Sequence, residues 1–274
     1  MKSYLYHIKA ISNLHVGSGE ANEAVIDNLI QRDAISTLPV INSSSLKGAL
    51  REHCKHMQFV ERIFGSDVKS TDKRMAGTYH FFDARLLAMP VRGDKAPYFM
   101  ATSPSVLADY FYTLDMFGIV YPKQLQLLSQ IEITTPVVWS KRYNGTRIED
   151  LADLAALRTD LPDLAMLIGA PCLLLPDKAF TDLCNNNHLP VIARNYLNDG
   201  KSENLWYEQV LPRYSLLYFN LLVPDEDMYI DTFDQTITSS LVQIGANATV
   251  GYGFCHLEKN GESGIKKDNP HENK

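Results

Sequence analysis

The protein has 274 residues, of which 45% are hydrophobic, and a formal net charge of −6 at pH 7. This length and apolar content predict one large globular domain, or a core domain with insertions. No apolar run is long enough to span a bilayer, and residues 1–14 alternate polar with apolar residues where a signal peptide would be continuously apolar. We therefore expect a cytoplasmic protein without membrane contact.

Positive charge is concentrated in the N-terminal third of the chain. Residues 1–100 contain 13 Lys and Arg against 10 Asp and Glu, whereas residues 101–274 contain 13 against 22. An acidic protein repels phosphate on average, so any phosphate-binding surface should draw mainly on the first hundred residues.

The cysteines do not predict a disulfide framework or a zinc site. Cys54, Cys172, Cys184 and Cys255 are scattered without a C-x-x-C pair, which is typical of reduced core residues. His53, Cys54 and His56 do not all point the same way on a helix, which argues against zinc there as well.

The N-terminal segment predicts a strand, a loop and a long helix. Residues 3–11 are rich in aromatic and branched side chains with rough period-two alternation, which indicates a core strand. Gly17 and Gly19 then begin a loop. Apolar residues recur at spacings of three or four across 42–64, after several candidate N-caps, which predicts one helix that ends at Gly65.

The rest of the chain alternates strands, helices and insertions. The predicted elements are an insertion at 66–77, strands at 78–89, 131–139, 172–175, 189–197, 216–223 and 254–258, helices at 105–117, 148–168 and 233–244, and a disordered tail at 259–274. The turn residues Leu197–Gly200 predict an extended hairpin over about 189–212. The order β-α-β-β-α-β predicts an α+β fold, a ferredoxin-like (RRM-like) domain with long insertions.

Three basic residues stand four apart on the predicted helix. Lys47, Arg51 and Lys55 should share a face beside the apolar stripe. The start of the helix, from Asn42 to Ser44, offers backbone N–H groups and hydroxyls that attract phosphate. An ordinary solvated helix face is the alternative interpretation.

A glycine-rich loop lies near the C-terminus. Gly245, Gly251 and Gly253 fall between the last predicted helix and the last predicted strand, and glycine allows close approach of a ligand to the backbone. A plain connection between the two elements is the alternative.

Asp27 lies between the glycine break and the predicted helix, with apolar residues on both sides. Its carboxylate could bind a divalent cation or orient a ribose 2′-hydroxyl for attack on the adjacent phosphorus. The residues alone do not separate it from Asp33, Glu20 and Glu23, or from an inert loop acid. His15 is a second candidate, as an acid, a base or an RNA contact.

Several motifs together resemble the RAMP superfamily of CRISPR-associated proteins. They are LHVGSGE, VIDNLIQRD, PVINSSSLKGALR and IFGS in the N-terminal region and GANATVGYGFC near the C-terminus. The segment from Leu189 to Phe219 also resembles the hairpin region of the backbone subunit of the type III-B effector, the Cmr complex. This resemblance covers most of the chain from Leu14 to about Cys255.

The resemblance implies a fold and a set of partners. The fold would be a single domain over residues 1–258, a ferredoxin-like palm with a thumb hairpin. Its copies would stack into a filament along guide CRISPR RNA beside other Cmr subunits, and complementary single-stranded target RNA would be cut at regular intervals.

The resemblance also implies roles for individual residues. Asp27 falls on the family's catalytic aspartate, expected to position Mg²⁺ or another divalent cation near the scissile phosphate. The implied RNA-binding residues are His15, Gly17, Asn42, Ser44, Lys47, Arg51, Arg194, Trp206, Tyr207, Gly251 and Gly253. Two alternatives stay open: a scaffold subunit in which Asp27 is inert, and a metal-independent processing endonuclease that uses His15.

Overall fold

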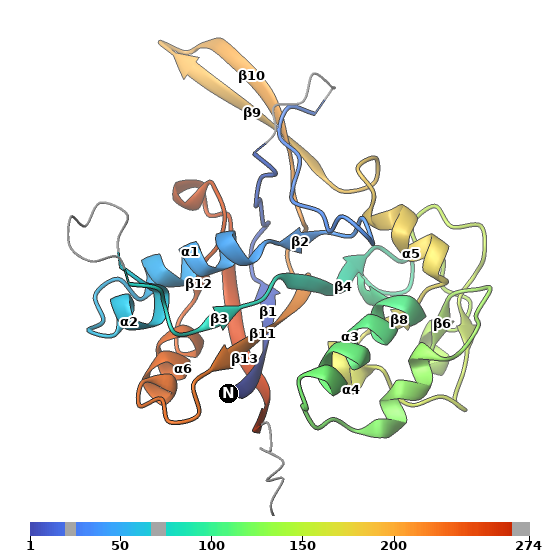
Figure 1. Ribbon diagram of the computed structural model, residues 1–274. Coiled ribbons are helices and arrows are strands. Elements are labelled where there is room, and N and C mark those ends of the chain that lie inside the picture. The colour runs from blue at the N-terminus through green and yellow to red at the C-terminus, as the bar shows by residue number, and fades with distance from the viewer. Residues whose placement is uncertain (20–25, 67–74, 265–274) are drawn as a thin grey trace, which may run out of the picture.

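The computed structural model describes residues 1–19, 26–66 and 75–264, which form an α+β fold around a large mixed sheet (Figure 1). The strands are β1 (Lys2–Ala10), β2 (Val40–Ile41), β3 (His80–Phe81), β4 (Ala84–Val91), β5 (Phe99–Thr102), β6 (Val137–Val138), β7 (Ala156–Leu157), β8 (Cys172–Leu174), β9 (Val191–Asn198), β10 (Lys201–Gln209), β11 (Leu216–Val223), β12 (Val242–Gln243) and β13 (Phe254–Gly264). The α-helices are α1 (Ser43–His53), α2 (Val60–Phe64), α3 (Pro104–Met116), α4 (Ala165–Ile168), α5 (Asp177–Cys184) and α6 (Ile230–Thr238), and the 3₁₀ helices are η1 (Lys123–Ser129), η2 (Lys141–Tyr143) and η3 (Ala248–Val250).

Four antiparallel strands form the centre of the sheet, in the order β13, β1, β11, β4. We call these strands, together with α1 and α6, the palm. Tyr6 of β1 stacks on Phe219 of β11 with ring centroids 5.0 Å apart, and its hydroxyl donates a hydrogen bond to Asp234 of α6. Residues 4, 6 and 8 of β1 therefore face α6, and residues 5, 7 and 9 face the other side of the sheet.

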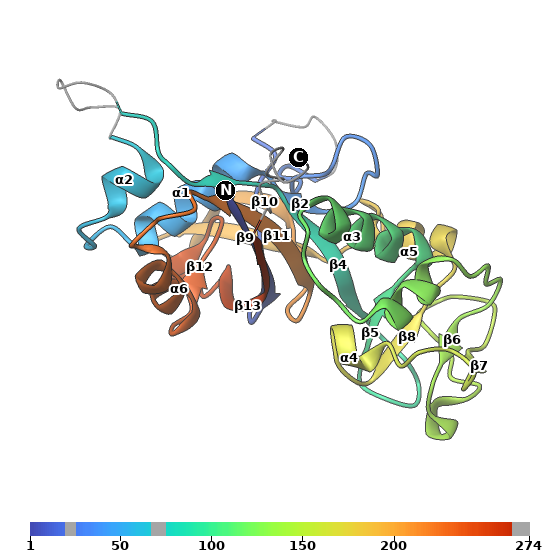
Figure 2. The ribbon, with the colours of Figure 1, turned by 60° about the horizontal axis from the view of Figure 1, so that its bottom comes forward.

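Residues 92–190 form a lobe beside the palm (Figures 1 and 2). Strand β4 belongs to both parts, because it pairs with β11 in the palm and with β5 in the lobe. The sheet then continues through β8, β6 and β7.

Strands β9 and β10 form a separate two-stranded hairpin that projects away from the palm and the lobe (Figure 1). It lies within the range 189–212 in which the turn residues predict a hairpin. Asp199 and Gly200 at its tip have φ of 48° and 77°, the positive values that a two-residue type I′ turn requires.

The single helix expected over 42–64 is wrong, because the chain breaks it into α1 and α2. Turns occupy the segment between them, and Phe59 is buried while Met57 is 40% exposed. Phe59 packs against Tyr229 with ring centroids 5.8 Å apart, and a continuous helix would turn Met57 toward the core in its place. The structure thus buries Phe59 where the apolar period places Met57.

The lobe also departs from the sequence expectations. The strand expected over 131–139 is reduced to β6, and the helix expected over 148–168 is replaced by loops, β7 and the one-turn helix α4. The backbone of this segment bonds to distant partners: Ala156 N–H donates to Pro136 O at 2.8 Å and Arg158 N–H to Val138 O at 2.9 Å. The apolar residues of this segment are spaced as in a helix, but they belong to loops and short elements and not to one helix.

The C-terminal elements extend beyond the expected boundaries. Strand β13 continues to Gly264, so a tail that begins at residue 259 is wrong; residues 265–274 lie outside the described part of the chain. Lys259 belongs to this extension, because it pairs with Tyr6 of β1 and its Nζ binds Asp234 at 2.8 Å. After a shift of register, residues 261–264 pair with residues 2–5 of β1. The helix expected over 233–244 is α6, which ends at Thr238, followed by β12.

No helix in the described residues is long and apolar enough to cross a membrane.

Candidate nucleic-acid interface

Asp27 lies at the root of the hairpin. Its side chain is exposed, and its Oδ2 accepts a hydrogen bond of 2.8 Å from the backbone N–H of Tyr207. The next residue continues the pairing, because Asn28 N–H donates to Tyr207 O at 3.1 Å and Gln209 N–H donates to Asn28 O at 2.9 Å. The end of β10 therefore fixes the carboxylate in place and leaves it open to solvent.

The other candidate acids of this region differ from Asp27. Asp33 closes its own turn, since its Oδ1 accepts hydrogen bonds from the N–H groups of Ile35 at 3.1 Å and Ser36 at 2.6 Å. Glu20 and Glu23 lie outside the described residues. Asp27 is thus the exposed acid held by the hairpin.

His15 is buried below this surface, with 4% of its area exposed. Its Nδ1 lies 2.6 Å from Gln209 O, and because a carbonyl oxygen only accepts, Nδ1 carries the hydrogen. Nε2 points toward Gly17, where an added Cβ would lie 3.2 Å away. This geometry suits a residue that supports the hairpin root more than one that contacts RNA directly.

The glycine-rich loop packs on the backbone of His15. Ala246 N–H donates to His15 O at 2.9 Å, and a Cβ on Gly245 would lie 2.3 Å from the same oxygen. A Cβ on Gly253 would lie 2.0 Å from Ile244 O, so Gly253 serves the internal turn of the loop, whereas one on Gly251 would meet nothing within 4 Å. Of these three glycines, Gly251 is the one with open space beside it.

The basic ridge expected on the helix is shorter in the structure. Lys55 lies beyond the end of α1 and its Nζ binds Glu52 at 2.6 Å, which leaves Lys47 and Arg51. Arg51 donates from Nη1 to Gly65 O at 3.0 Å. Lys47 has no hydrogen bond or ion pair within the described part of the chain, so it is the residue of the ridge that is available to a phosphate.

The start of α1 offers fewer free donors than the sequence predicts. Asn42 N–H donates to Gln31 Oε1 at 2.8 Å, and Ser43 N–H donates to a carboxylate oxygen of Asp83 at 2.6 Å. The Asp83 carboxylate therefore occupies the position that a phosphate would take at the Ser43 N–H. Ser44 lies one residue farther along the helix and is exposed.

Two of the hairpin residues predicted to bind RNA, Arg194 and Trp206, meet at one buried acid that the sequence did not single out. Glu208 is 6% exposed, and its Oε1 accepts a hydrogen bond of 2.9 Å from Trp206 Nε1. Arg194 Nη1 lies 4.0 Å from Oε2 of Glu208 and its guanidinium lies 5.7 Å from the Tyr252 ring centroid. The contact between Trp206 and Glu208 could have been predicted from the sequence, because the two residues lie on the same face of the predicted strand.

A divalent cation at Asp27 would need ligands from outside the protein. Residues 1–19, 26–66 and 75–264 contain no group of three or more His, Cys, Asp or Glu that could hold a metal ion. Of the two carboxylate oxygens of Asp27, Oδ2 has a hydrogen-bond partner among the described residues and Oδ1 has none, so Oδ1 could serve as a ligand. Mg²⁺ commonly binds one or two carboxylates together with substrate phosphates, so the donor set fits a cation shared with RNA.

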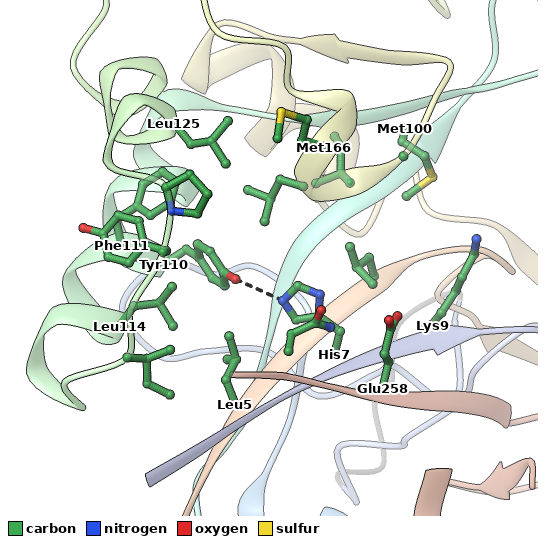
Figure 3. A pocket seen from close by; sticks show the side chains of 18 of the residues that line it. Leu5, His7, Lys9, Met100, Tyr110, Phe111, Leu114, Leu125, Met166 and Glu258 are labelled. Atoms are coloured by element: carbon green, nitrogen blue, oxygen red, sulfur yellow. Dashed lines mark hydrogen bonds between the residues drawn. The ribbon is translucent and has the colours of Figure 1, made fainter. Parts of the chain in front are cut away.

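A separate pocket lies on the face of the palm sheet opposite α6 (Figure 3). It has a volume of about 400 Å³ and an apolar wall from the lobe that includes Tyr110 and Met166. His7, Lys9 and Glu258 rise from the sheet, and His7 Nε2 lies 3.1 Å from the Tyr110 hydroxyl. None of the RNA-binding residues predicted from the sequence lines this pocket.

A family model and a relative match the chain over nearly its whole length, and a second relative matches part of it. The family model described as the RAMP superfamily matches residues 7–256. The CRISPR system Cmr endoribonuclease Cmr4 of Pyrococcus furiosus is 32% identical over 289 residues, which cover 94% of this chain and 95% of that protein. The CRISPR system CMR subunit Cmr4 of Saccharolobus solfataricus is 38% identical over 92 residues, or 32% of this chain and 29% of that protein.

Solved structures share the fold. A chain in the cryo-EM structure of the type III-B Cmr-beta bound to cognate target RNA superposes with a TM-score of 0.79 at 24% identity, covering 94% of this chain and 96% of that one. The crystal structure of oligomeric Cmr4 from Pyrococcus furiosus gives a TM-score of 0.71 at 26% identity, with coverage of 95% and 99%.

Proposed function

This chain belongs to the RAMP superfamily and, within it, to the Cmr4 family, and we propose from this premise that it is a backbone subunit of a type III-B CRISPR complex that cuts target RNA. The related protein from Pyrococcus furiosus bears the name endoribonuclease. The observation in this chain that carries the proposal is the exposed Asp27 carboxylate, fixed by Tyr207 at the root of a projecting hairpin.

The proposed assembly places RNA across the palm. Guide CRISPR RNA would follow Lys47, Arg51 and the open side of Gly251, with further copies of the chain and other Cmr subunits alongside. The four antiparallel palm strands with α1 and α6 support a ferredoxin-like (RRM-like) palm, and the β9–β10 hairpin would act as a thumb between guide and target.

Asp27 has two duties in the proposed cleavage. Its Oδ2 is engaged by the Tyr207 N–H, which fixes the direction of the carboxylate, and its Oδ1 is directed at RNA or at a cation that RNA shares. There the carboxylate orients the 2′-hydroxyl of the target ribose toward the adjacent phosphorus. A bound Mg²⁺ would stabilise negative charge on the phosphate oxygens.

The test uses the complex assembled with guide RNA and a labelled target. Asp27→Asn preserves an oxygen that can accept the Tyr207 N–H and removes only the charge, so target should bind as in the wild type and remain uncut. Wild-type cleavage should require Mg²⁺ and stop with chelator. Normal cleavage by Asp27→Asn would remove Asp27 from the reaction and favour the scaffold alternative, and cleavage in chelator would remove the metal from the proposal.

A further inference from the structure

The buried carboxylate of Glu208 joins the hairpin root to the glycine-rich loop. Asn247, in that loop, donates from Nδ2 to Oε2 of Glu208 at 2.7 Å, while Trp206 Nε1 donates to Oε1 at 2.9 Å. Arg194 Nη1 lies 4.0 Å from Oε2. We call these four residues, Arg194, Trp206, Glu208 and Asn247, the Glu208 clasp. Asn247 is the one member that does not belong to the hairpin.

The loop side of the clasp is held rigidly. Asn247 has φ of 66°, in the left-handed region that Asn and Asp tolerate better than most residues. The preceding Ala246 N–H binds His15 O at 2.9 Å, and the N–H groups of Val250 and Tyr252 both donate to Asn247 O at 3.2 Å. The Asn247 amide therefore projects from a fixed backbone toward Glu208.

The other side of the clasp leads to Asp27. Glu208 is flanked by Tyr207, whose N–H binds Asp27 Oδ2 at 2.8 Å, and by Gln209, whose N–H binds Asn28 O at 2.9 Å. The side chain of Glu208 thus anchors the short backbone segment that determines where the Asp27 carboxylate lies. Asp27 and Asn247 are connected through this single strand residue.

We propose that Asn247 is a positioning residue for RNA cleavage, which holds the hairpin root, and with it Asp27, through the buried Glu208 carboxylate. The proposal rests on the function proposed above. Loss of the Asn247 donor leaves a buried carboxylate short of a partner, and such a group drives local rearrangement. A displacement of about 1 Å at a catalytic group lowers a rate by about a hundredfold.

A reciprocal exchange of the two side chains tests the contact itself. Asn247→Asp keeps the left-handed backbone conformation and the size of the side chain, but it places a second carboxylate against Glu208. Adding Glu208→Gln restores the bond in reverse, because the Gln amide then donates to the carboxylate introduced at position 247 and its oxygen remains for Trp206. Glu208→Gln alone completes the double-mutant cycle. Asn260→Asp, the same substitution on β13 outside the site, is the matched control.

Two measurements, the cleavage rate and the tryptophan emission, compare the variants with the wild type. In the assembled complex, the single-turnover cleavage rate of Asn247→Asp at saturating target should fall by about tenfold or more, with guide and target affinities nearly unchanged, and the exchanged pair should recover most of that rate. Independently of RNA, a Trp139→Phe background leaves Trp206 as the one tryptophan of the chain. Its emission should shift in Asn247→Asp and return in the exchanged pair.

Defined outcomes would overturn the proposal. Cleavage by Asn247→Asp at the wild-type rate would do so, as would an exchanged pair no faster than Asn247→Asp. A parallel fall of rate and guide affinity would make Asn247 an RNA contact. An unshifted Trp206 emission in Asn247→Asp would by itself contradict the Glu208 clasp. Full cleavage by Asp27→Asn would contradict the proposed function but not the Glu208 clasp.

Discussion

Asp27 and Tyr207 stand 180 residues apart in the chain, and Oδ2 of Asp27 accepts the Tyr207 N–H at 2.8 Å. This hydrogen bond makes the position of the carboxylate depend on the hairpin root. Asp27→Glu keeps the charge but adds a methylene, so the acid either loses Tyr207 or moves its free oxygen. We expect cleavage about a hundredfold slower with target affinity unchanged, measured by single-turnover assay. Asp153→Glu, an exposed acid of the lobe, should cleave normally; a fully active Asp27→Glu would show that exact placement is unimportant.

His15 is predicted to support the hairpin root and not to exchange protons with RNA. His15→Asn retains an N–H near the position of Nδ1 and can still donate to Gln209 O, whereas His15→Ala leaves that buried oxygen unpaired. We expect His15→Ala to lose about 1–3 kcal/mol of unfolding free energy and His15→Asn less, by urea denaturation. Metal-independent cutting of repeat RNA that both variants abolish would favour the processing-enzyme alternative.

Alanine substitutions of Lys47 and Arg51 should have different effects on stability, although both residues belong to α1. Lys47 has no partner among the described residues, so Lys47→Ala should weaken guide binding and lower the slope of log affinity against log salt by about 1, with stability unchanged. Arg51 donates to Gly65 O, so Arg51→Ala should also lose about 1 kcal/mol of unfolding free energy. Binding titrations at several salt concentrations and urea denaturation separate the two effects. An unchanged salt slope in Lys47→Ala would remove that residue from the phosphate contacts.

Two glycines of the glycine-rich loop that both have a positive φ provide a matched comparison. Gly245 and Gly251 have φ of 86° and 84°, so alanine strains both alike, by about 1 kcal/mol. Only at Gly245 does the new Cβ also collide, 2.3 Å from His15 O. Gly245→Ala should therefore unfold at a lower temperature than Gly251→Ala. Gly251→Ala should instead reduce guide affinity if RNA lies in the open space beside it, as filter binding would show.

His7 predicts a pH dependence of stability. Burial lowers the pKa of His7 to about 4, so the folded protein holds it neutral. The contribution of neutral His7 to the free energy of unfolding is complete above the ordinary histidine pKa of about 6.5, and it is lost as the pH falls toward 4. Between pH 7 and pH 5 the wild type should lose about 2 kcal/mol more unfolding free energy than His7→Gln, which can keep a bond to Tyr110. Equal losses in the two proteins would contradict this, and exposed His80→Gln is the control.

The order of strands and helices in the palm was predictable because each palm strand carries its own pattern. Residues 216–223 form β11 as expected, and β1 and α3 differ from their predicted ranges by one residue at each end. In the lobe the patterns misled, since backbone partners such as Pro136 for Ala156 come from other segments. Local spacing does not report such long-range bonds.

The sequence by itself indicated the family and the approximate places of the palm strands and the hairpin, and the family resemblance of its motifs singled out Asp27, because motifs and apolar periods are local properties. Tertiary structure alone decided that Tyr207 fixes Asp27, that His15 is buried against Gln209, that Asp83 occupies the start of α1, and that Glu208 joins Asn247 to the hairpin. These contacts unite residues between 39 and 194 positions apart. They depend on how strands pair in space, and no spacing along the chain encodes that.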